Sequence, residues 1–184
     1  MALIPVSVRN LLGSLVASPG KETSRLRVDQ ANTAFWEGRE FRFEYEVSER
    51  IVFKFSSPID FILQLQNLAS HDGSATLTVW SPDQGAIAGS FNIPANIKSN
   101  NGMDSAPIYA RQISITSGGD FTPLAGLSLN DAREYVKVKS ASATAQSSTV
   151  GGTAVRERGL KAGDYYLVLT GTEASYRLVF EERP

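Results

Sequence analysis

The clearest structural signal in this sequence is Gly159-Leu-Lys-Ala-Gly-Asp-Tyr-Tyr-Leu-Val-Leu-Thr-Gly-Thr-Glu-Ala-Ser-Tyr-Arg-Leu-Val-Phe180. Gly163 predicts a turn, because glycine adopts positive φ without a Cβ clash. Tyr165–Leu169 is apolar on both faces, which is typical of a strand covered from both sides. Every second side chain in Tyr176–Phe180 is apolar, the period of a strand with one face toward a core. The stretch therefore predicts a hairpin of a buried strand and a closing strand.

Earlier segments show the same two-residue alternation of apolar and polar side chains, and turn residues separate them. These segments are 41–47, 51–55, 61–65 and 75–79. Four strands at about ten-residue spacing are typical of an antiparallel sandwich or barrel. Weaker strand patterns follow at 91–97, 108–116 and 135–138. The predicted fold is all-β: an antiparallel, jelly-roll-like two-sheet β-sandwich of about eight strands, with 165–169 as a central strand.

We assign the sandwich domain to residues 33–184. Two segments differ in composition from the rest of the chain: one precedes this domain and the other is a loop within it. Residues 1–32 combine a rough helical spacing of apolar side chains with a break at Ser18-Pro19-Gly20. They predict either an element packed on the domain or an N-terminal arm that contacts another subunit. Residues 140–153 carry no charge and only small side chains. We expect a flexible loop there, or an arm that becomes ordered against a neighbouring subunit.

Length and composition narrow the classes of function. A chain of 184 residues can bury one good core, and 42% hydrophobic with 20% charged residues fits a globular protein. The net charge of -1 offers no basic surface for nucleic acid. The absence of cysteine excludes disulfides, thiolate metal sites and cysteine nucleophiles. The start of the chain lacks a cationic leader and no apolar run reaches the length of a bilayer, so we expect synthesis in the cytoplasm and no membrane partner.

The sequence predicts no catalytic centre. His71 is the only histidine, and Ser70-His71-Asp72-Gly73 is typical of an exposed turn rather than part of a triad. One histidine without cysteine also excludes the usual zinc sites. Glu44 and Glu46 share one strand face, as a glycosidase pair would. Their neighbours, Arg42 and Lys54, favour a charge-balanced solvated sheet face instead. We therefore expect no enzyme activity, no cofactor and no metal.

Three aromatic residues are candidate ligand or interface contacts: Trp36, Trp80 and Tyr166. Trp36 follows Phe35, and Trp80 stands at the end of a predicted strand. Exposed tryptophan rings at strand ends can stack on sugars, but tryptophan in a β domain more commonly packs in the core or against a subunit.

The alternating segments, together with Gly159-Leu-x-Ala-Gly-x-Tyr-Tyr-Leu-x-Leu and the closing Tyr176-Arg-Leu, resemble the pre-peptidase C-terminal type of β-sandwich. The likeness covers roughly half the chain in two blocks. The long insert at 84–155 and the lack of an attached protease depart from that family. The resemblance implies the sandwich fold and transfers no function.

In composition the chain is similar to a small structural protein of a tailed bacteriophage. The likeness rests on the Met1-Ala-Leu-Ile-Pro5 start, the lack of cysteine, the predicted sandwich and the small-residue arms. It implies a non-enzymatic virion protein, either a capsid decoration protein or a tail or fibre attachment module. Such a protein would form a homo-oligomer and bind other virion proteins. The alternative is a carbohydrate- or ligand-binding sandwich that contacts surface glycans or another ligand through Trp36, Trp80 and Tyr166.

Overall fold

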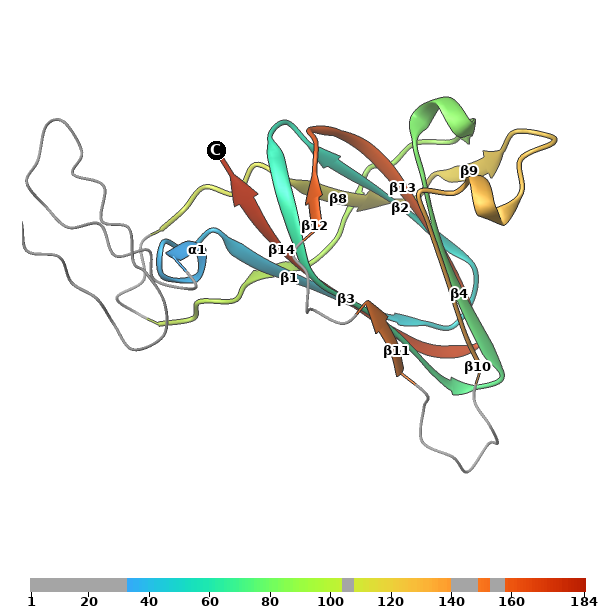
Figure 1. Ribbon diagram of the computed structural model, residues 1–184, viewed down its shortest axis with the longest axis horizontal. Coiled ribbons are helices and arrows are strands. Elements are labelled where there is room, and N and C mark those ends of the chain that lie inside the picture. The colour runs from blue at the N-terminus through green and yellow to red at the C-terminus, as the bar shows by residue number, and fades with distance from the viewer. Residues whose placement is uncertain (1–32, 104–107, 140–148, 153–157) are drawn as a thin grey trace, which may run out of the picture. The chain divides into compact units, whose positions relative to one another are not determined.

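The computed structural model describes residues 33–103, 108–139, 149–152 and 158–184. The chain divides into two compact units, Met1–Thr33 and Ala34–Pro184. The predictions for residues 1–32 and for 140–148 lie outside the described residues. A short helix, α1 (Thr33–Trp36), precedes the first strand (Figure 1).

The first sheet contains six strands, all paired antiparallel. Their order is β11 (Thr149–Gly152), β3 (Asp60–Asp72), β14 (Glu173–Arg183), β1 (Glu40–Val47) and β7 (Ile97–Ser99), and β12 (Arg158–Leu160) also pairs with β3. The longest contact in this sheet joins β3 to β14, the closing strand of the sequence.

The second sheet also contains six antiparallel strands. Their order is β10 (Glu134–Lys139), β4 (Ser74–Trp80), β13 (Gly163–Thr170), β2 (Ile51–Ser57), β8 (Ser114–Ser117) and β6 (Ile93–Pro94). A separate pair, β5 (Gly85–Ala88) and β9 (Asp120–Pro123), lies between two 3-10 turns, η1 (Pro82–Gln84) and η2 (Leu129–Asp131), along the chain. A capping box opens η2, where the Ser128 N–H donates to the Asp131 carboxylate at 2.7 Å.

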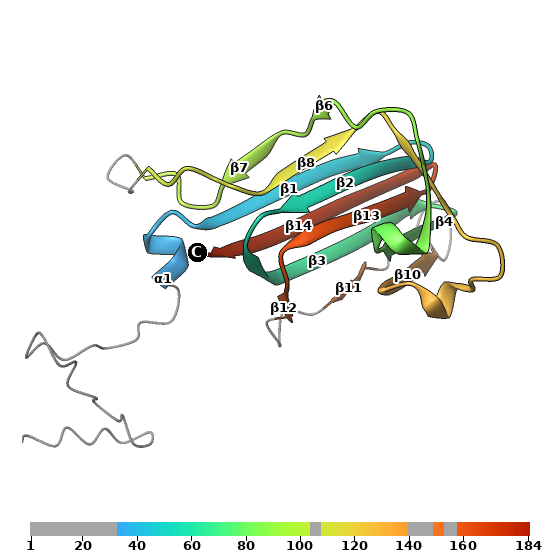
Figure 2. The ribbon, with the colours of Figure 1, turned by 90° about the horizontal axis from the view of Figure 1, so that it is seen from above.

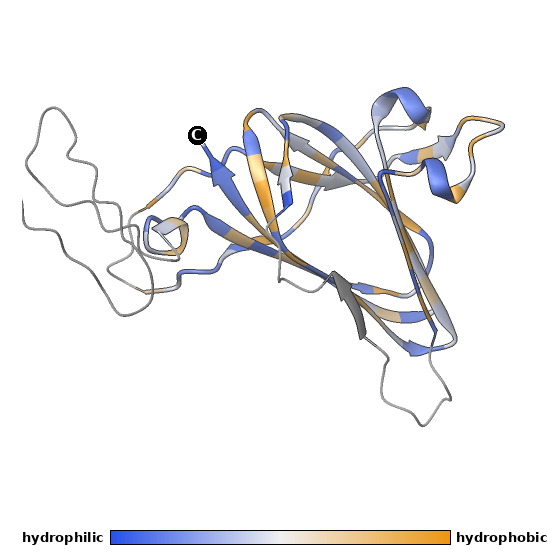
Figure 3. Ribbon diagram, in the orientation of Figure 1, coloured by the Kyte–Doolittle hydropathy of each residue, from blue (hydrophilic) through white to orange (hydrophobic). Residues whose placement is uncertain are grey.

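The two sheets pack face to face, so the predicted all-β two-sheet sandwich is confirmed. The long strands of the two sheets run in similar directions (Figure 2). Along them hydrophobic and hydrophilic residues alternate (Figure 3). Aromatic rings from opposite sheets meet in the core: Phe43 and Phe53 have centroids 5.0 Å apart, and Phe55 and Phe180 lie 5.4 Å apart. The alternation in the sequence therefore places these rings between the layers.

The predicted C-terminal hairpin is wrong. β13 pairs with β2 and β4 in the second sheet, whereas β14 pairs with β1 and β3 in the first. The chain crosses from one sheet to the other at Gly171 and Thr172. Two-residue periodicity reports which face of a strand is buried and carries no information about its hydrogen-bonding partner. The prediction that 165–169 is a central strand covered on both faces is confirmed, since Leu167 and Leu169 are buried on one face and Tyr166 and Val168 on the other.

Two further sequence expectations need correction. Within the predicted loop 140–153, residues 149–152 form β11 and pair with Gln66–Ala69. β3 also does not alternate through Leu65, because a β-bulge shifts its register: Leu63 lies opposite Phe180, but Leu65 lies opposite Val179. The extra residue reverses the faces beyond it. Gln66, and not Leu65, consequently shares the core face with Leu63.

Candidate functional site

Two of the three predicted contact residues lie inside a small hydrophobic cluster on the outer face of the second sheet. Trp80 and Tyr166 are each 2% exposed, and the Tyr166 ring stacks on Phe121 with centroids 4.7 Å apart. Burial raises the pKa of the Tyr166 hydroxyl. Trp36 is not part of this cluster and remains 50% exposed on α1. The structure thus brings two of the three rings together as core, and a contact role for them stays a prediction that requires the cluster to open.

The polar residues that the sequence analysis considered as possible catalytic groups do not form a common site. Glu44 forms an exposed ion pair with Arg177 at 3.2 Å. Lys54, expected beside Glu44, lies in the other sheet and pairs with Asp164 at 2.8 Å. The exposed His71 ring lies 3.2 Å from the Ser175 hydroxyl. Among the described residues, no group of three or more histidine, aspartate and glutamate side chains could hold a metal ion.

A cavity of about 220 Å³ lies between the two sheets. Most of its wall is apolar and comes from five strands and the β12 segment. The apolar and aromatic lining residues are Phe55, Phe61, Leu63, Val79, Leu160, Tyr165, Leu167 and Leu178. A dry apolar cavity of about 150 Å³ accommodates a benzene ring, so this one has room for a somewhat larger apolar group.

One side of the cavity is polar. Glu134, Arg158 and Gln66 meet there: the Arg158 guanidinium donates to the Glu134 carboxylate at 2.6 Å. When the Gln66 amide is oriented so that both of its polar atoms are satisfied, its nitrogen donates to the same carboxylate at 3.1 and 3.3 Å. The Arg158 side chain is 52% exposed and the Glu134 side chain only 18%, so the ion pair marks the passage from the cavity to solvent.

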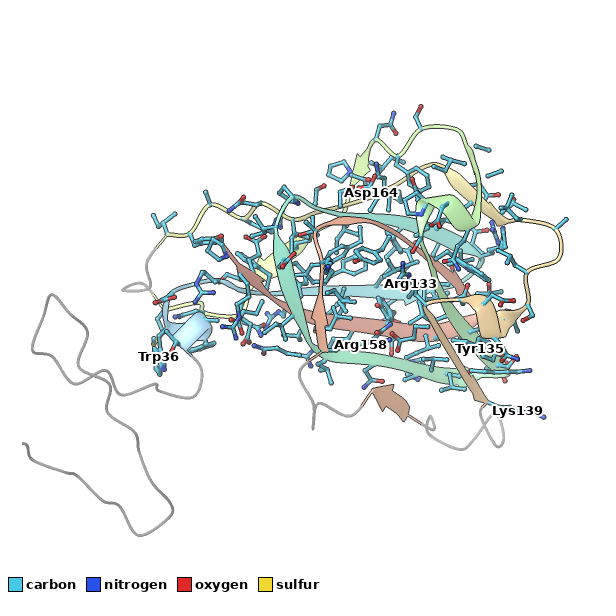
Figure 4. All side chains as sticks on the ribbon, turned by 45° about the horizontal axis from the view of Figure 1, so that its top comes forward. Trp36, Arg133, Tyr135, Lys139, Arg158 and Asp164 are labelled. Carbon is cyan, nitrogen blue, oxygen red and sulfur yellow. The ribbon has the colours of Figure 1, made fainter. Side chains whose placement is uncertain are left out.

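Arg133 also lines the cavity. Its Nε donates to the Ser81 hydroxyl at 2.7 Å, and its backbone carbonyl accepts a bond from Arg158 at 3.3 Å. Figure 4 labels both arginines: Arg133 lies just before β10, and Arg158 lies on β12. Three charged side chains therefore border the cavity, two positive and one negative.

Tyr176 contributes a buried hydroxyl to the polar side of the cavity. The residue is 1% exposed, and its hydroxyl lies beside the Gln66 side chain. Burial raises the pKa of this hydroxyl far above its usual range, and the negative charge of Glu134 adds to the effect, while a hydrogen bond with the Gln66 side chain lowers the pKa. The hydroxyl is therefore neutral at physiological pH.

Local structure explains why polar groups face an otherwise apolar interior. The bulge in β3 turns Gln66 inward, as described above. On β10, Glu134 shares a face with Val136 and Val138, which pack against the main core. β10 is an edge strand, so the Glu134 carboxylate reaches the rim of the sandwich, where Arg158 neutralises it.

Sequence reasoning did not single out any of the polar cavity residues. For Glu134 a signal existed, since the alternation of Glu134, Val136 and Val138 places a carboxylate on an apolar face. No comparable signal existed for Gln66, because the position of a bulge is set by pairing with another strand. Arg158 reaches the cavity only through the pairing of β12 with β3.

Comparison with known protein families, with curated proteins and with solved structures finds no match to this chain. The likeness to the pre-peptidase C-terminal sandwich and to phage structural proteins therefore stays a prediction. Among the residues that the structure describes, no helix is both long enough and apolar enough to cross a bilayer.

Proposed function

We propose that this protein is a non-enzymatic binding module that holds a small, largely apolar ligand between its two sheets. The observation that carries the proposal is the cavity of about 220 Å³, whose wall is mostly apolar and whose border carries charged side chains. Moving apolar surface of a ligand out of water and into such a cavity is favourable. A polar group of the ligand would lie at the border, near Glu134, Arg158 and Tyr176.

The size and lining of the cavity restrict the ligand. Scaling from benzene in about 150 Å³, the cavity holds on the order of nine non-hydrogen atoms. Its wall of leucine, valine and aromatic side chains favours an alkyl chain or a single ring over a sugar, which presents hydroxyl groups on all sides. Carbohydrate binding at the exposed Trp36 is a separate prediction, independent of this cavity.

Leu160→Phe is expected to abolish binding of 1-octanol while preserving the fold. Leu160 lies on β12 opposite Phe61 and lines the cavity, so a larger ring at this position occupies the ligand's space. Binding is measured by titrating 1-octanol into labelled protein and following amide chemical shifts. Leu127→Phe, an equal change at an exposed position outside the cavity, is the control. The proposal fails if the wild-type protein does not bind 1-octanol, or if Leu160→Phe binds it equally well.

A second candidate function is the structural role in a phage virion, as a capsid decoration or tail attachment protein. The feature that favours a role in assembly is a set of exposed leucine and isoleucine side chains on β5, in the loop between β9 and η2, and on η2. These are Ile87, Leu124, Leu127 and Leu129, between 37% and 51% exposed. Backbone bonds hold the segment in place, since Leu124 donates to the Gln84 carbonyl at 2.9 Å. Exposed large apolar side chains are found at subunit contacts.

The assembly role predicts a homo-oligomer that depends on these side chains. Light scattering after size exclusion should give a mass of two or more chains for the wild-type protein. Leu124→Asp with Leu129→Asp should give the mass of one chain, because burying two carboxylates in an interface is costly. Leu124→Ala with Leu129→Ala is the matched control and should weaken the oligomer less. A wild-type protein that stays monomeric at high concentration contradicts the role.

A further inference from the structure

We infer that the ligand of this cavity is a monoanionic amphiphile, a short-chain carboxylate whose charged group binds Arg133 and whose alkyl chain lies between the sheets. The inference rests on the proposed ligand-binding function and adds to it the charge and the length of the ligand.

The positive side chains around the cavity outnumber the negative ones. Arg158 is neutralised by Glu134 at 2.6 Å, and Glu134 also accepts two bonds from Gln66. Arg133 donates to a serine hydroxyl, and no carboxylate of the described residues lies within ion-pair distance of it. The cavity border therefore carries a net positive charge, and Arg133 is its unmatched cation.

Arg133 differs in this respect from most other arginines of the sandwich. Arg39, Arg50, Arg177 and Arg183 each have a carboxylate partner within 3.5 Å. With its Nε already bonded to Ser81, Arg133 still has the N–H groups of its two terminal nitrogens to offer. Two such donors in one plane match the two oxygens of a carboxylate.

The same border disfavours a doubly charged ligand. Glu134 lines the cavity next to Arg133 in sequence, and its carboxylate would repel an incoming anion. The repulsion from Glu134 and the attraction to the two arginines both grow in proportion to the charge of the ligand. A monoanion neutralises the net positive charge of the border, whereas a phosphate dianion would make the border negative. A single negative charge is the best match to two cations and one anion.

The apolar part of the ligand follows from the cavity volume. About 220 Å³ accommodates an alkyl chain of roughly eight carbons, with the carboxylate at the border beside Arg133. A chain of twice that length would have to leave part of its surface in water. Octanoate and the uncharged 1-octanol are therefore suitable probes, since they share a chain length and differ in charge.

The experiment is a calorimetric titration of both probes into wild-type protein, Arg133→Gln, Arg133→Lys and Lys137→Gln at constant pH and low salt. Lys137 is the matched control, because it is an exposed cation on β10, the strand that follows Arg133, but does not line the cavity. We expect Arg133→Gln to weaken octanoate binding by about tenfold. Its affinity for 1-octanol should not change. Arg133→Lys should keep much of the octanoate affinity, and Lys137→Gln should keep all of it.

The outcomes separate this inference from the function on which it rests. If both probes bind the wild-type protein and Arg133→Gln leaves octanoate binding unchanged, the assigned charge is wrong and the cavity remains a ligand site. If Arg133→Gln weakens the binding of both probes equally, the assigned charge is again wrong and the cavity remains a ligand site. If neither probe binds the wild-type protein, the proposed ligand-binding function itself is overturned.

Discussion

Phe180→Ala is expected to lower the free energy of unfolding by about 3–5 kcal/mol, the usual cost of removing a fully buried phenylalanine ring. Phe180 is 0% exposed, and its ring contacts Phe41 at 5.8 Å and Phe55 at 5.4 Å between centroids. Phe41 belongs to the same sheet as Phe180, whereas Phe55 comes from the opposite one. The substitution would therefore open a void where the two layers meet, and chemical denaturation would measure the loss.

Phe91→Ala is the matched control for this prediction. Phe91 is only partly buried and packs against Tyr166 in the small outer cluster, with centroids 5.5 Å apart. The same substitution should lower the free energy of unfolding less than half as much there, because folding removes less of the apolar surface of Phe91 from water. Equal losses for the two variants would mean that the inter-sheet core does not dominate the stability of the sandwich.

Glu182→Ala is expected to cost about 3 kcal/mol of unfolding free energy, because it leaves two main-chain donors without a partner. Glu182 is 0% exposed, and its carboxylate accepts the backbone N–H groups of Gln112 at 2.9 Å and Ile113 at 2.7 Å. These bonds anchor the segment that leads into β8 to the end of β14. Amide hydrogen exchange at residues 112 and 113 should accelerate more than exchange in the central strands.

Two further variants separate the role of this carboxylate from that of surface charge. Glu182→Gln keeps one carbonyl acceptor and should lie between wild type and Glu182→Ala. Glu44→Ala removes an exposed carboxylate that pairs with Arg177, and such pairs contribute about 0–1 kcal/mol. If Glu182→Ala is no more destabilising than Glu44→Ala, the carboxylate does not hold the segment before β8.

Much of the sandwich was predictable from residue spacing. Tyr176, Leu178 and Phe180 alternate in the sequence and are all buried in the core. The hydrophilic end of β14 was less predictable (Figure 3), since Glu181 and Glu182 are buried although their type suggests exposure. Their burial depends on partners far away in the sequence, among them Gln64, Arg39 and the backbone at residue 112.

The candidate site was not predictable to the same degree. The sequence favoured Trp80 and Tyr166 as contacts because aromatic rings bind ligands well, but their exposure depends on whether another strand covers them. In the structure, Phe121 of β9 covers both rings. The polar cavity residues come from β3, β12, β14, and β10 with the residue before it, and no local pattern links these segments.

By itself, the amino-acid sequence determined that this is an all-β protein, where most of its long strands lie along the chain, and which side chains of those strands are apolar on a common face. These properties are local, since they follow from the two-residue repeat of an extended chain and from the preferences of turn residues. Only the tertiary structure decided that β13 and β14 belong to different sheets, that a bulge turns Gln66 inward, and that Arg133 lacks the carboxylate partner Arg158 has. Strand pairing, bulges and ion pairs join residues distant in sequence, so they arise only when the sheets assemble.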